Sequence, residues 1–586
     1  MKLVEALQLG GKPLDPDQPT KTLALVCGFT PLHLETFLLA YARSGSSGRN
    51  LKISSGLYGD LLGNVDRASA AGPDFAAVVL EWADLDPRLG LRSSGGWLPE
   101  TLPSIADAVR DALRKIEQSL ARLAEKAPVV LSPPTLPLPP VAHTAGWQAS
   151  GFVLSLEALL AGFLERAATL ANVHIVSRQR LEEVSPAASR LDPRMELGAG
   201  FPYSAAHADA LAKLLWTVLD PPAPKKGLIT DLDNTFWSGI LGEAGVTGVT
   251  WSQEDHTQIH GLYQQMLASL AASGVLVGVA SKNDAALVQE ALGRTDLLTP
   301  LHSIFPVEAH WGAKSESVAR ILEAWNIGAD SVVFLDDSAL ELAEVQARFP
   351  AITALQFPSS NRPDELWRLL WHLRDLFGRP QILEEDRLRA GSLRAATHFS
   401  MTSTTGASPA FIASVEPEIT LDFSKTTDLR RAFELVNKTN QFNLNGRRLT
   451  ESDWTNKLED PDGFLLTVSY QDKFGPLGRI AVALGRKSAG VCFIDAWVLS
   501  CRAFSRLIEH QILRHLFLIT GARDIIFDYT PTARNSPLQE FFSSVFGAEW
   551  KASEAVPDGL RLPRNRFEEI CPELPHRIKE TAIASH

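Results

Sequence analysis

Cysteine is scarce in this chain of 586 residues, which has four: Cys27, Cys492, Cys501 and Cys571. None of them belongs to a CxxC pair. Because zinc sites and disulfide frameworks need closely and regularly spaced cysteines, the sequence indicates neither. This cysteine usage favours a reducing compartment.

Long apolar runs are also missing. The most apolar stretches, such as 274–280, are far shorter than the ~20 residues that cross a bilayer. The first twenty residues include Glu5 and several prolines where an export signal needs an uninterrupted apolar region. The sequence therefore predicts a cytoplasmic protein without a membrane partner.

Positive charge is in deficit, with 56 Lys and Arg against 68 Asp and Glu, and no long basic run offsets the net charge of −12. Non-specific nucleic-acid binding depends on such basic surfaces, so a nucleic-acid partner is not expected. Hydrophobic residues make up 45% and charged residues 21%, as in ordinary globular proteins. At about 150 residues per domain, the length predicts several domains.

The pattern of apolar segments predicts an α/β multidomain protein. In the first part, short apolar runs alternate with segments of helical spacing, as in α/β domains, at 23–29, 77–82, 128–131 and 173–176. The run PPAPKK at 221–226 cannot continue a helix, because proline lacks an amide donor. We place the first domain boundary there.

A second block repeats the strand–helix pattern, which predicts a parallel sheet. Its strands are expected at 227–231, 274–281 and 331–337. A charged helix is expected at 383–396, and the small and hydroxylated residues of 398–415 suggest a linker.

The third block predicts an α+β domain that begins near Pro417. Extended runs occupy 464–470, 479–484 and 491–499, and a helix is expected at 503–519. The predicted domains are therefore 1–225, 226–380 and 416–586, with 381–415 as a helix and linker.

Polar residues follow each predicted strand of the second block. Asp231 and Asp233 end the first strand in the motif DLDNT, Ser281-Lys282-Asn283 ends the second, and Asp336-Asp337 ends the third. Lys314 follows a polar turn between the last two. Ligands bind at the carboxyl ends of parallel strands, so these groups are expected to meet at one edge of the sheet.

This order of residues resembles the four motifs of the haloacid-dehalogenase (HAD) superfamily, a family with a Rossmann-like parallel sheet. The resemblance implies that Asp231 attacks phosphorus as a nucleophile that is already ionised at neutral pH. Asp233 would then serve as the general acid and base.

The same resemblance implies binding sites for the metal and the phosphate. Mg²⁺ would be held by Asp231, the backbone carbonyl of Asp233 and either Asp336 or Asp337, between which the sequence does not choose. The phosphoryl group would be bound by the residues after the second strand and by the lysine, namely Ser281, Lys282, Asn283 and Lys314.

Flanking segments at 231–245, 309–338, 437–450 and 499–510 resemble the FkbH family of polyketide pathways. That family implies dephosphorylation of 1,3-bisphosphoglycerate or a similar acyl phosphate, a small three-carbon substrate. The D-glyceryl unit then becomes a thioester on a phosphopantetheinylated acyl carrier protein. Attack of Asp231 on the phosphorus of the acyl phosphate would leave a free carboxylate that can no longer form a thioester. The 3-phosphate is therefore the productive target.

Cys501 in Ser500-Cys501-Arg502 corresponds to the cysteine that carries the acyl group in this family. We expect it to open the helix at 503–519 near Arg502 and Arg506, which favours a thiolate; a buried structural cysteine is the alternative. The third domain resembles the acetyltransferase (GNAT) fold. Acyl or pantetheine contacts are expected from Asn440, Gln441, Asn443, Arg502 and Arg506, although a polar turn also accounts for the asparagines.

The chain departs from the family pattern at several positions. Ala244 and Ser238 replace an acidic residue and a glycine, and Leu342 stands where the family has an arginine. The first domain faintly resembles SGNH hydrolases but has Cys27-Gly28-Phe29-Thr30 in place of the Gly-Asp-Ser nucleophile motif. We expect it to be catalytically degenerate.

Two functions stay open at this point. One is acyl loading of a carrier protein through Cys501, and the other is a stand-alone phosphatase whose third domain only binds. A non-catalytic scaffold is disfavoured because Asp231, Asp233, Lys314 and Asp336 are all present. The sequence leaves the oligomeric state open.

Overall fold

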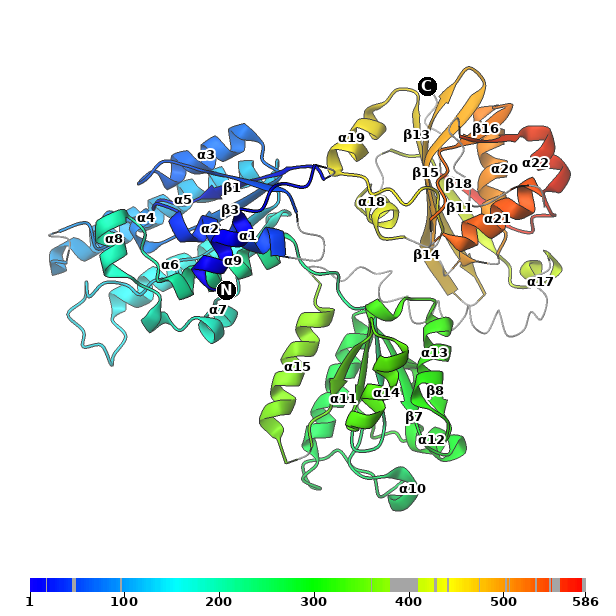
Figure 1. The fold of residues 1–586 in the computed structure, drawn as a ribbon, viewed down its shortest axis with the longest axis horizontal. Helices are drawn as coiled ribbons and strands as arrows, with labels where there is room; N and C mark the ends of the chain where they lie inside the picture. Colours follow the sequence, from blue (N-terminus) through cyan, green and yellow to red (C-terminus); the bar gives the residue numbers. More distant parts are fainter. Residues whose placement is uncertain are drawn as a thin grey trace. The chain divides into compact units, whose positions relative to one another are not determined.

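The chain divides into two compact units, Met1–Ala223 and Pro224–His586. The computed structural model describes every residue except 17, 45–48, 95–96, 360, 380–408, 426–428, 440–441, 474, 501–502, 505, 533–534, 548–549, 551–558 and 582–586. The described residues form three sheets with helices around them (Figure 1). The architecture is α/β, as the sequence predicts.

The sheet of the first unit has five strands in the order β2-β1-β3-β4-β5, and every neighbouring pair is parallel. The strands are β1 (Lys21–Val26), β2 (Leu51–Ser55), β3 (Phe75–Val79), β4 (Val129–Ser132) and β5 (Val173–Ile175). The sequence predicted four of them. The edge strand β2 was missed because Leu51 is its one buried residue, so it has no apolar run.

Helices cover both faces of this sheet. The helices are α1 (Leu3–Gly10), α2 (Leu32–Ser44), α3 (Leu61–Ala71), α4 (Trp82–Leu85), α5 (Leu102–Ala124), α6 (Gly151–Ala167), α7 (Arg178–Val184), α8 (Pro193–Ala199) and α9 (Ala205–Leu219). One core cluster joins the sheet to α3, α5 and α6, and a second joins it to α1, α2 and α9. Trp82, expected to end a strand, instead begins α4.

The long helix α5 shows why these segments are helical. Its apolar residues Ile105, Val109, Leu113 and Ile116 recur every three or four positions and are all buried, whereas its charged residues lie on the other side. Within the described part of the chain, no helix is both long and apolar enough to cross a membrane.

The first sheet of the second unit is also parallel, in the order β10-β9-β6-β7-β8. Its strands are β6 (Gly227–Thr230), β7 (Leu276–Ser281), β8 (Ile304–Ala309), β9 (Val332–Asp336) and β10 (Thr353–Gln356). The three strands that the sequence predicted are the central ones. The edge strands β8 and β10 are mostly half-exposed, so their sequences lack a continuous apolar run.

Helices again pack on both faces of this sheet. They are α10 (Leu241–Ala244), α11 (Gln258–Ala272), α12 (Ala285–Leu292), α13 (Lys314–Trp325), α14 (Ala339–Arg348) and α15 (Pro363–Phe377). α11, α12 and α15 share one core with the sheet, and α13 and α14 share the other. The ring of Trp325 lies 2.5 Å from where a Cβ atom of Gly227 would stand, and 2.8 Å from that of Gly278. These two glycines let α13 approach β6 and β7 closely.

The last sheet is mixed, with the order β17-β16-β15-β14-β13-β11-β18 and with β12 paired to β15. Its strands are β11 (Glu418–Asp422), β12 (Phe442–Asn443), β13 (Gly463–Asp472), β14 (Gly475–Ser488), β15 (Val491–Leu499), β16 (Asp524–Phe527), β17 (Leu560–Pro563) and β18 (Arg577–Thr581). The surrounding helices are α17 (Pro409–Ser414), α18 (Leu429–Lys438), α19 (Glu451–Glu459), α20 (Ile508–Thr520), α21 (Ser536–Phe546) and α22 (Arg564–Ile570). α18 and α19 pack on one face, and α20, α21 and α22 on the other.

One predicted boundary in this part is wrong. The helix expected at 503–519 begins at Ile508, because Leu507 has a φ of 57°, in the left-handed region that interrupts a helix. Cys501, which was expected to open this helix, lies outside the described residues. The helix expected at 383–396 and most of the linker lie outside the described residues.

Candidate active site

Asp231 stands at the carboxyl end of the central strand β6. The four residues of β6 are buried, and the amide of Asp231 still donates to the carbonyl of Leu335 on β9, at 3.0 Å. The chain then leaves the sheet, so the Asp231 side chain lies at the strand end and is 5% exposed.

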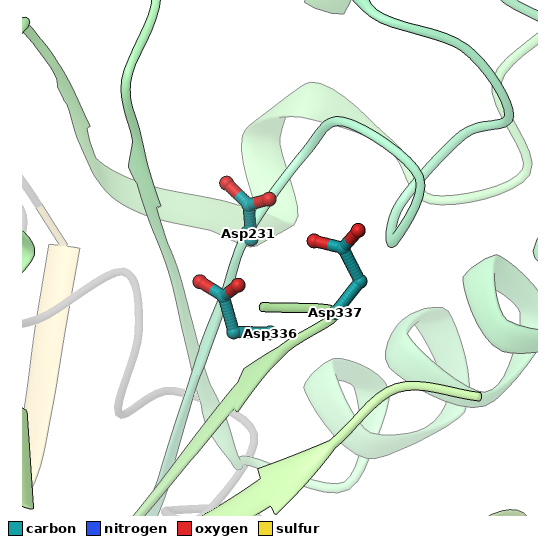
Figure 2. Close-up of side chains that lie close together, drawn as sticks. All are labelled: Asp231, Asp336 and Asp337. Carbon is teal, nitrogen blue, oxygen red and sulfur yellow. The ribbon is translucent and has the colours of Figure 1, made fainter. Parts of the chain in front are cut away.

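Asp336 and Asp337 reach the same point from β9. Candidate ligand oxygens of Asp231, Asp336 and Asp337 all lie within 4.8 Å of one another. Figure 2 shows the three carboxyl groups clustered where the two adjacent strands end. The sequence did not choose between Asp336 and Asp337, and the structure places both in the cluster.

Lys314, the first residue of α13, points its ammonium group into this cluster. Its Nζ lies 2.8 Å from Oδ1 of Asp231 and 2.5 Å from Oδ2 of Asp336, and it also contacts Glu341. Lys314 is 3% exposed. A buried ammonium group needs such partners, and here it balances part of the charge of the carboxylates.

The buried carboxyl groups have altered proton affinities. Burial raises the pKa of Asp231 to about 7, although the ammonium of Lys314 lowers it; the negative charge of Asp336 raises it further. Burial likewise raises the pKa of Asp336 to about 6, against the opposing effect of Lys314. Burial also lowers the pKa of Lys314, but the charges of Asp231 and Asp336 outweigh it and leave that pKa above its ordinary value.

The three carboxyl groups fit a hard divalent cation. Mg²⁺ prefers carboxylate oxygens and binds through one or two carboxylates while it keeps several waters. Asp231, Asp336 and Asp337 offer such oxygens, and one lysine does not balance three carboxylates. The side chain of Asp233 is not part of this group, and the role of its carbonyl stays a prediction.

Asp233 is held beside the cluster by three donors. Its Oδ1 accepts from the indole of Trp237 at 3.0 Å and from the amide of Leu241 at 3.1 Å, and its Oδ2 accepts from Nδ2 of Asn283 at 3.0 Å. The same Asn283 amide donates to Oγ of Ser281, also at 3.0 Å. The strand-end residues of β6 and β7 are thus joined, as the sequence predicts.

Beside Asp337 lies a cavity of about 450 Å³. Its lining includes Asn234, His260, Gln356 and Arg362. This volume is in the range of pockets for small ligands. A small ligand therefore has room next to Asp337.

Glu341 is a site residue to which the sequence analysis gave no role. It lies in the first turn of α14 and contacts Lys314 and, at 3.0 Å, the ammonium of Lys282. Its one sequence signal is its place five residues after Asp336. Glu341 therefore links the two predicted phosphate-binding lysines, Lys282 and Lys314.

Replacing Glu341 by Ala is expected to lower the rate of phosphate release by roughly 10–100-fold, because Lys314 loses one of the groups that position it. Steady-state release of inorganic phosphate measures the effect. Glu290→Ala, at an exposed position on α12, is the matched control. An unchanged rate in Glu341→Ala would show that this residue does not contribute to the reaction.

The predicted acyl and pantetheine residues are only partly described. Cys501, Arg502, Asn440 and Gln441 lie outside the described residues. Both polar atoms of the Asn443 side chain bind backbone groups, with Nδ2 donating to Thr439 and Oδ1 accepting from the amides of residues 445 and 446. Its contacts are those of a polar turn.

Arg506 is buried instead of lying on a helix surface. It is 1% exposed, its Nε lies 3.7 Å from Oδ2 of Asp472, and its guanidinium stands over the ring of Tyr470. Because α20 begins after it, Arg506 belongs to the turn that precedes the helix. Its role toward an acyl group stays a prediction.

The first unit holds a buried polar network that includes Glu81 and Thr135, which follow the ends of β3 and β4. Both ring nitrogens of His207 are engaged, with Oγ1 of Thr135 at 2.9 Å and Oγ of Ser185 at 3.0 Å. The carboxyl of Glu81 accepts from Thr135, from the Leu136 amide and from the hydroxyl of Tyr203. The network is arranged around the carboxyl group of Glu81 and the ring of His207.

This network is expected to make stability depend on pH. Burial raises the pKa of Glu81 to about 7 from 4.5, although hydrogen bonds from Thr135 and Tyr203 lower it. The folded chain then binds this proton more tightly than the unfolded chain. The free energy of unfolding should therefore fall as the pH rises from about 4.5 to about 7, by up to about 3 kcal/mol.

Urea unfolding of the full chain across this pH range measures the slope. Glu81→Gln should reduce the slope, whatever the absolute stability of the variant, because one of the buried carboxyl groups with a raised pKa is removed. Glu125→Gln, at an exposed position after α5, should leave it unchanged. An identical slope in Glu81→Gln and the unaltered chain would contradict the assignment.

Comparisons with known proteins place the fold. No family model matches the chain, and no curated protein does. Among solved structures, the N-terminal part of BF1531 from Bacteroides fragilis, which contains a phosphatase domain complexed with Mg, is matched with a TM-score of 0.51 and 18% identity, over 65% of this chain and 100% of that one.

Two further matches have TM-scores too low to carry an argument. One is an uncharacterized protein from Corynebacterium glutamicum, with a TM-score of 0.18 and 18% identity over 25% of this chain and 96% of that one. The other is an extracellular lipase from Streptomyces rimosus, with a TM-score of 0.22 and 15% identity over 35% of this chain and 100% of that one. The BF1531 match shows that the chain shares its fold, over about two thirds of its length, with a protein part that contains a phosphatase domain.

Proposed function

We propose that the chain is a Mg²⁺-dependent enzyme of the HAD type that removes a phosphoryl group from a small phosphoester. The observation that carries this proposal is the buried contact of Lys314 with both Asp231 and Asp336, beside Asp337. A lysine and carboxylates from separate strand ends meet where phosphoryl transfer needs a nucleophile and positive charge.

The residues suggest the following steps. A carboxylate oxygen of Asp231 attacks phosphorus, the bond from phosphorus to the ester oxygen breaks, and Asp233 gives its proton to the leaving alkoxide. Asp233 then takes a proton from the water that attacks the aspartyl phosphate, which releases inorganic phosphate. Mg²⁺ at Asp231, Asp336 and Asp337 would neutralise charge on the phosphoryl group.

We propose further that the substrate is 1,3-bisphosphoglycerate or a similar acyl phosphate and that the three-carbon unit passes to a carrier protein. The thiolate of Cys501 would attack the acyl carbon and displace the acyl phosphate as inorganic phosphate. The pantetheine thiol of the carrier would then take the acyl group and release the thiolate. Support comes from the segments at 437–450 and 499–510 and from the small cavity beside Asp337.

The test combines the full chain, Mg²⁺, 1,3-bisphosphoglycerate generated in situ and a phosphopantetheinylated carrier. Intact masses of enzyme and carrier are recorded, and inorganic phosphate is measured in parallel. A glyceryl adduct on both proteins is expected, and the enzyme adduct should vanish in Cys501→Ala. Cys571→Ala is the matched control, because Cys571 is a half-buried cysteine of the same region.

A stand-alone phosphatase is the second candidate, since the grouped residues around Asp231 account for phosphate release by themselves. Phosphate release without an adduct on either protein would overturn the acyl-transfer proposal and leave this candidate. Absence of phosphate release in the presence of Mg²⁺, both from this substrate and from simple phosphoesters such as p-nitrophenyl phosphate, would overturn both.

A further inference from the structure

A cavity of about 990 Å³ lies in the first unit, at the carboxyl ends of β1, β3 and β4. The strand order places β2 on one side of β1 and β3 on the other, so the connections after β1 and β3 run in opposite directions. Gly28 follows β1, Glu81–Asp84 follow β3, and all of them line the cavity. Such a point of divergence is where open parallel sheets bind ligands.

The walls of this cavity are largely apolar. They include side chains from four segments of the unit: Tyr58, Leu61, Trp82, Leu89, Ile116 and Leu138. The volume lies at the upper end of the range for small-molecule pockets. The cavity therefore suits a ligand with an apolar body.

The charged groups in the lining are mostly acidic. Five carboxyl residues stand against two basic ones, Arg92 and Lys115: they are Asp60, Glu81, Asp84, Asp111 and Glu196. Arg92 pairs with Oε1 of Glu196 at 3.1 Å, and Oε2 of Glu196 is buried with no hydrogen-bond partner among the described residues. The excess of carboxyl groups disfavours an anionic ligand, and Oε2 of Glu196 can still accept a hydrogen bond from a ligand.

Asp84 projects into the crevice between β1 and β3. Its Oδ1 lies 1.8 Å from where a Cβ atom of Gly28 would stand, so the glycine makes room for this carboxyl group. Its Oδ2 accepts from the amide of Glu81 at 2.8 Å. Glu81 itself is already bound by several donors. Asp84 and Glu196 are thus the acidic groups best placed to meet a ligand.

We propose that this cavity binds a small organic amine, with the ammonium group near Asp84 and Glu196 and the apolar body against the walls. The charge of the lining selects a cation, and the apolar walls select an organic body over an inorganic ion. This ligand site is separate from the phosphatase chemistry, so its test does not depend on that function.

Calorimetric titration of the full chain with phenylbutylamine, phenylbutanol and phenylbutyrate tests the proposal, since the probes share one apolar body and differ in charge. The amine is expected to bind on the order of tenfold tighter than the alcohol, and the carboxylate not to bind. Asp84→Asn and Glu196→Gln should each weaken amine binding by about tenfold. Asp107→Asn is the matched control, because Asp107 is an exposed residue of α5 outside the lining.

Proton release gives a second readout. Burial, together with the charges of Glu81 and Glu196, raises the pKa of Asp84 to about 7. Cys27 also lies near this group, and Arg92 pairs with Glu196. A bound ammonium ion lowers the pKa of Asp84, so amine binding near neutral pH should release a proton from this carboxyl group. Calorimetric titrations in buffers with different heats of ionisation detect this release, because the measured binding heat then differs between the buffers. Equal affinity for the three probes, tightest binding of the carboxylate, or no binding of the amine would each overturn the proposal.

Discussion

Asp231→Asn is expected to reduce phosphate release by on the order of 10⁴-fold or more, as loss of a catalytic nucleophile does. The amide cannot form the aspartyl phosphate, and the proposed Mg²⁺ site loses one of its three carboxylates. Asn and Asp have nearly the same shape, so packing around this buried position should be kept.

Stability separates this result from unfolding. Burial and the nearby charge of Asp336 raise the pKa of Asp231, so without a cation beside it the ionised form of Asp231 costs free energy in the folded chain. Removing that charge should leave the unfolding temperature unchanged or higher, because Lys314 still contacts Asp336 and Glu341.

Mass spectrometry and thermal unfolding check both parts of this prediction. A phosphorylated enzyme intermediate is expected in the unaltered chain and not in Asp231→Asn, while Asp330→Asn, at an exposed position, behaves like the unaltered chain. Retained phosphate release in a folded Asp231→Asn protein would show that another group attacks phosphorus.

The central strands could be predicted because they are buried on both faces. β6, β7 and β9 carry continuous apolar runs, and each is fully buried. β8 is instead half-exposed for most of its length, so nothing in its local sequence distinguishes it from a loop. Position at a sheet edge is a property of the tertiary fold.

The candidate site could be predicted largely because its residues stand at strand ends. In a parallel sheet, strand ends converge whatever lies between them in the sequence, which brings Asp231 to Asp336 and Asn283 to Asp233. Glu341 depends instead on the direction of α14, and its contact with Lys314 required the packing of two helices. The start of α20 could not be predicted because it depends on the left-handed backbone of Leu507, and leucine is not a residue type that indicates this conformation.

The cavity of the first unit could not be inferred from any single motif. Its lining comes from the segments after β1, β2, β3 and β4 and from helices α3, α5 and α8, and its acidic residues are far apart in the sequence. The missing Gly-Asp-Ser motif argued for a degenerate domain. The strand order nevertheless places a cavity at the strand ends of this domain.

Lys314→Met is expected to have the second large effect, on stability as well as on activity. The variant keeps the volume of the side chain but leaves Asp231, Asp336 and Glu341 without the ammonium group they share. Breaking a buried ion pair by removing one partner costs about 3–5 kcal/mol. Loss of positive charge beside the transferring phosphoryl group should also lower the rate by roughly 10²–10³-fold.

Mg²⁺ distinguishes the two roles of this lysine. A cation that binds the folded state raises its stability, and the variant has more uncompensated negative charge, so Mg²⁺ should stabilise Lys314→Met more than the unaltered chain. It should not restore the rate, because the phosphoryl contact is still missing. Lys282→Met is the matched control: Lys282 also contacts Glu341 but is 38% exposed, so its loss should cost less than about 1 kcal/mol. Equal destabilisation of the two variants in urea, measured with and without Mg²⁺, would contradict the buried charge balance on which the candidate site depends.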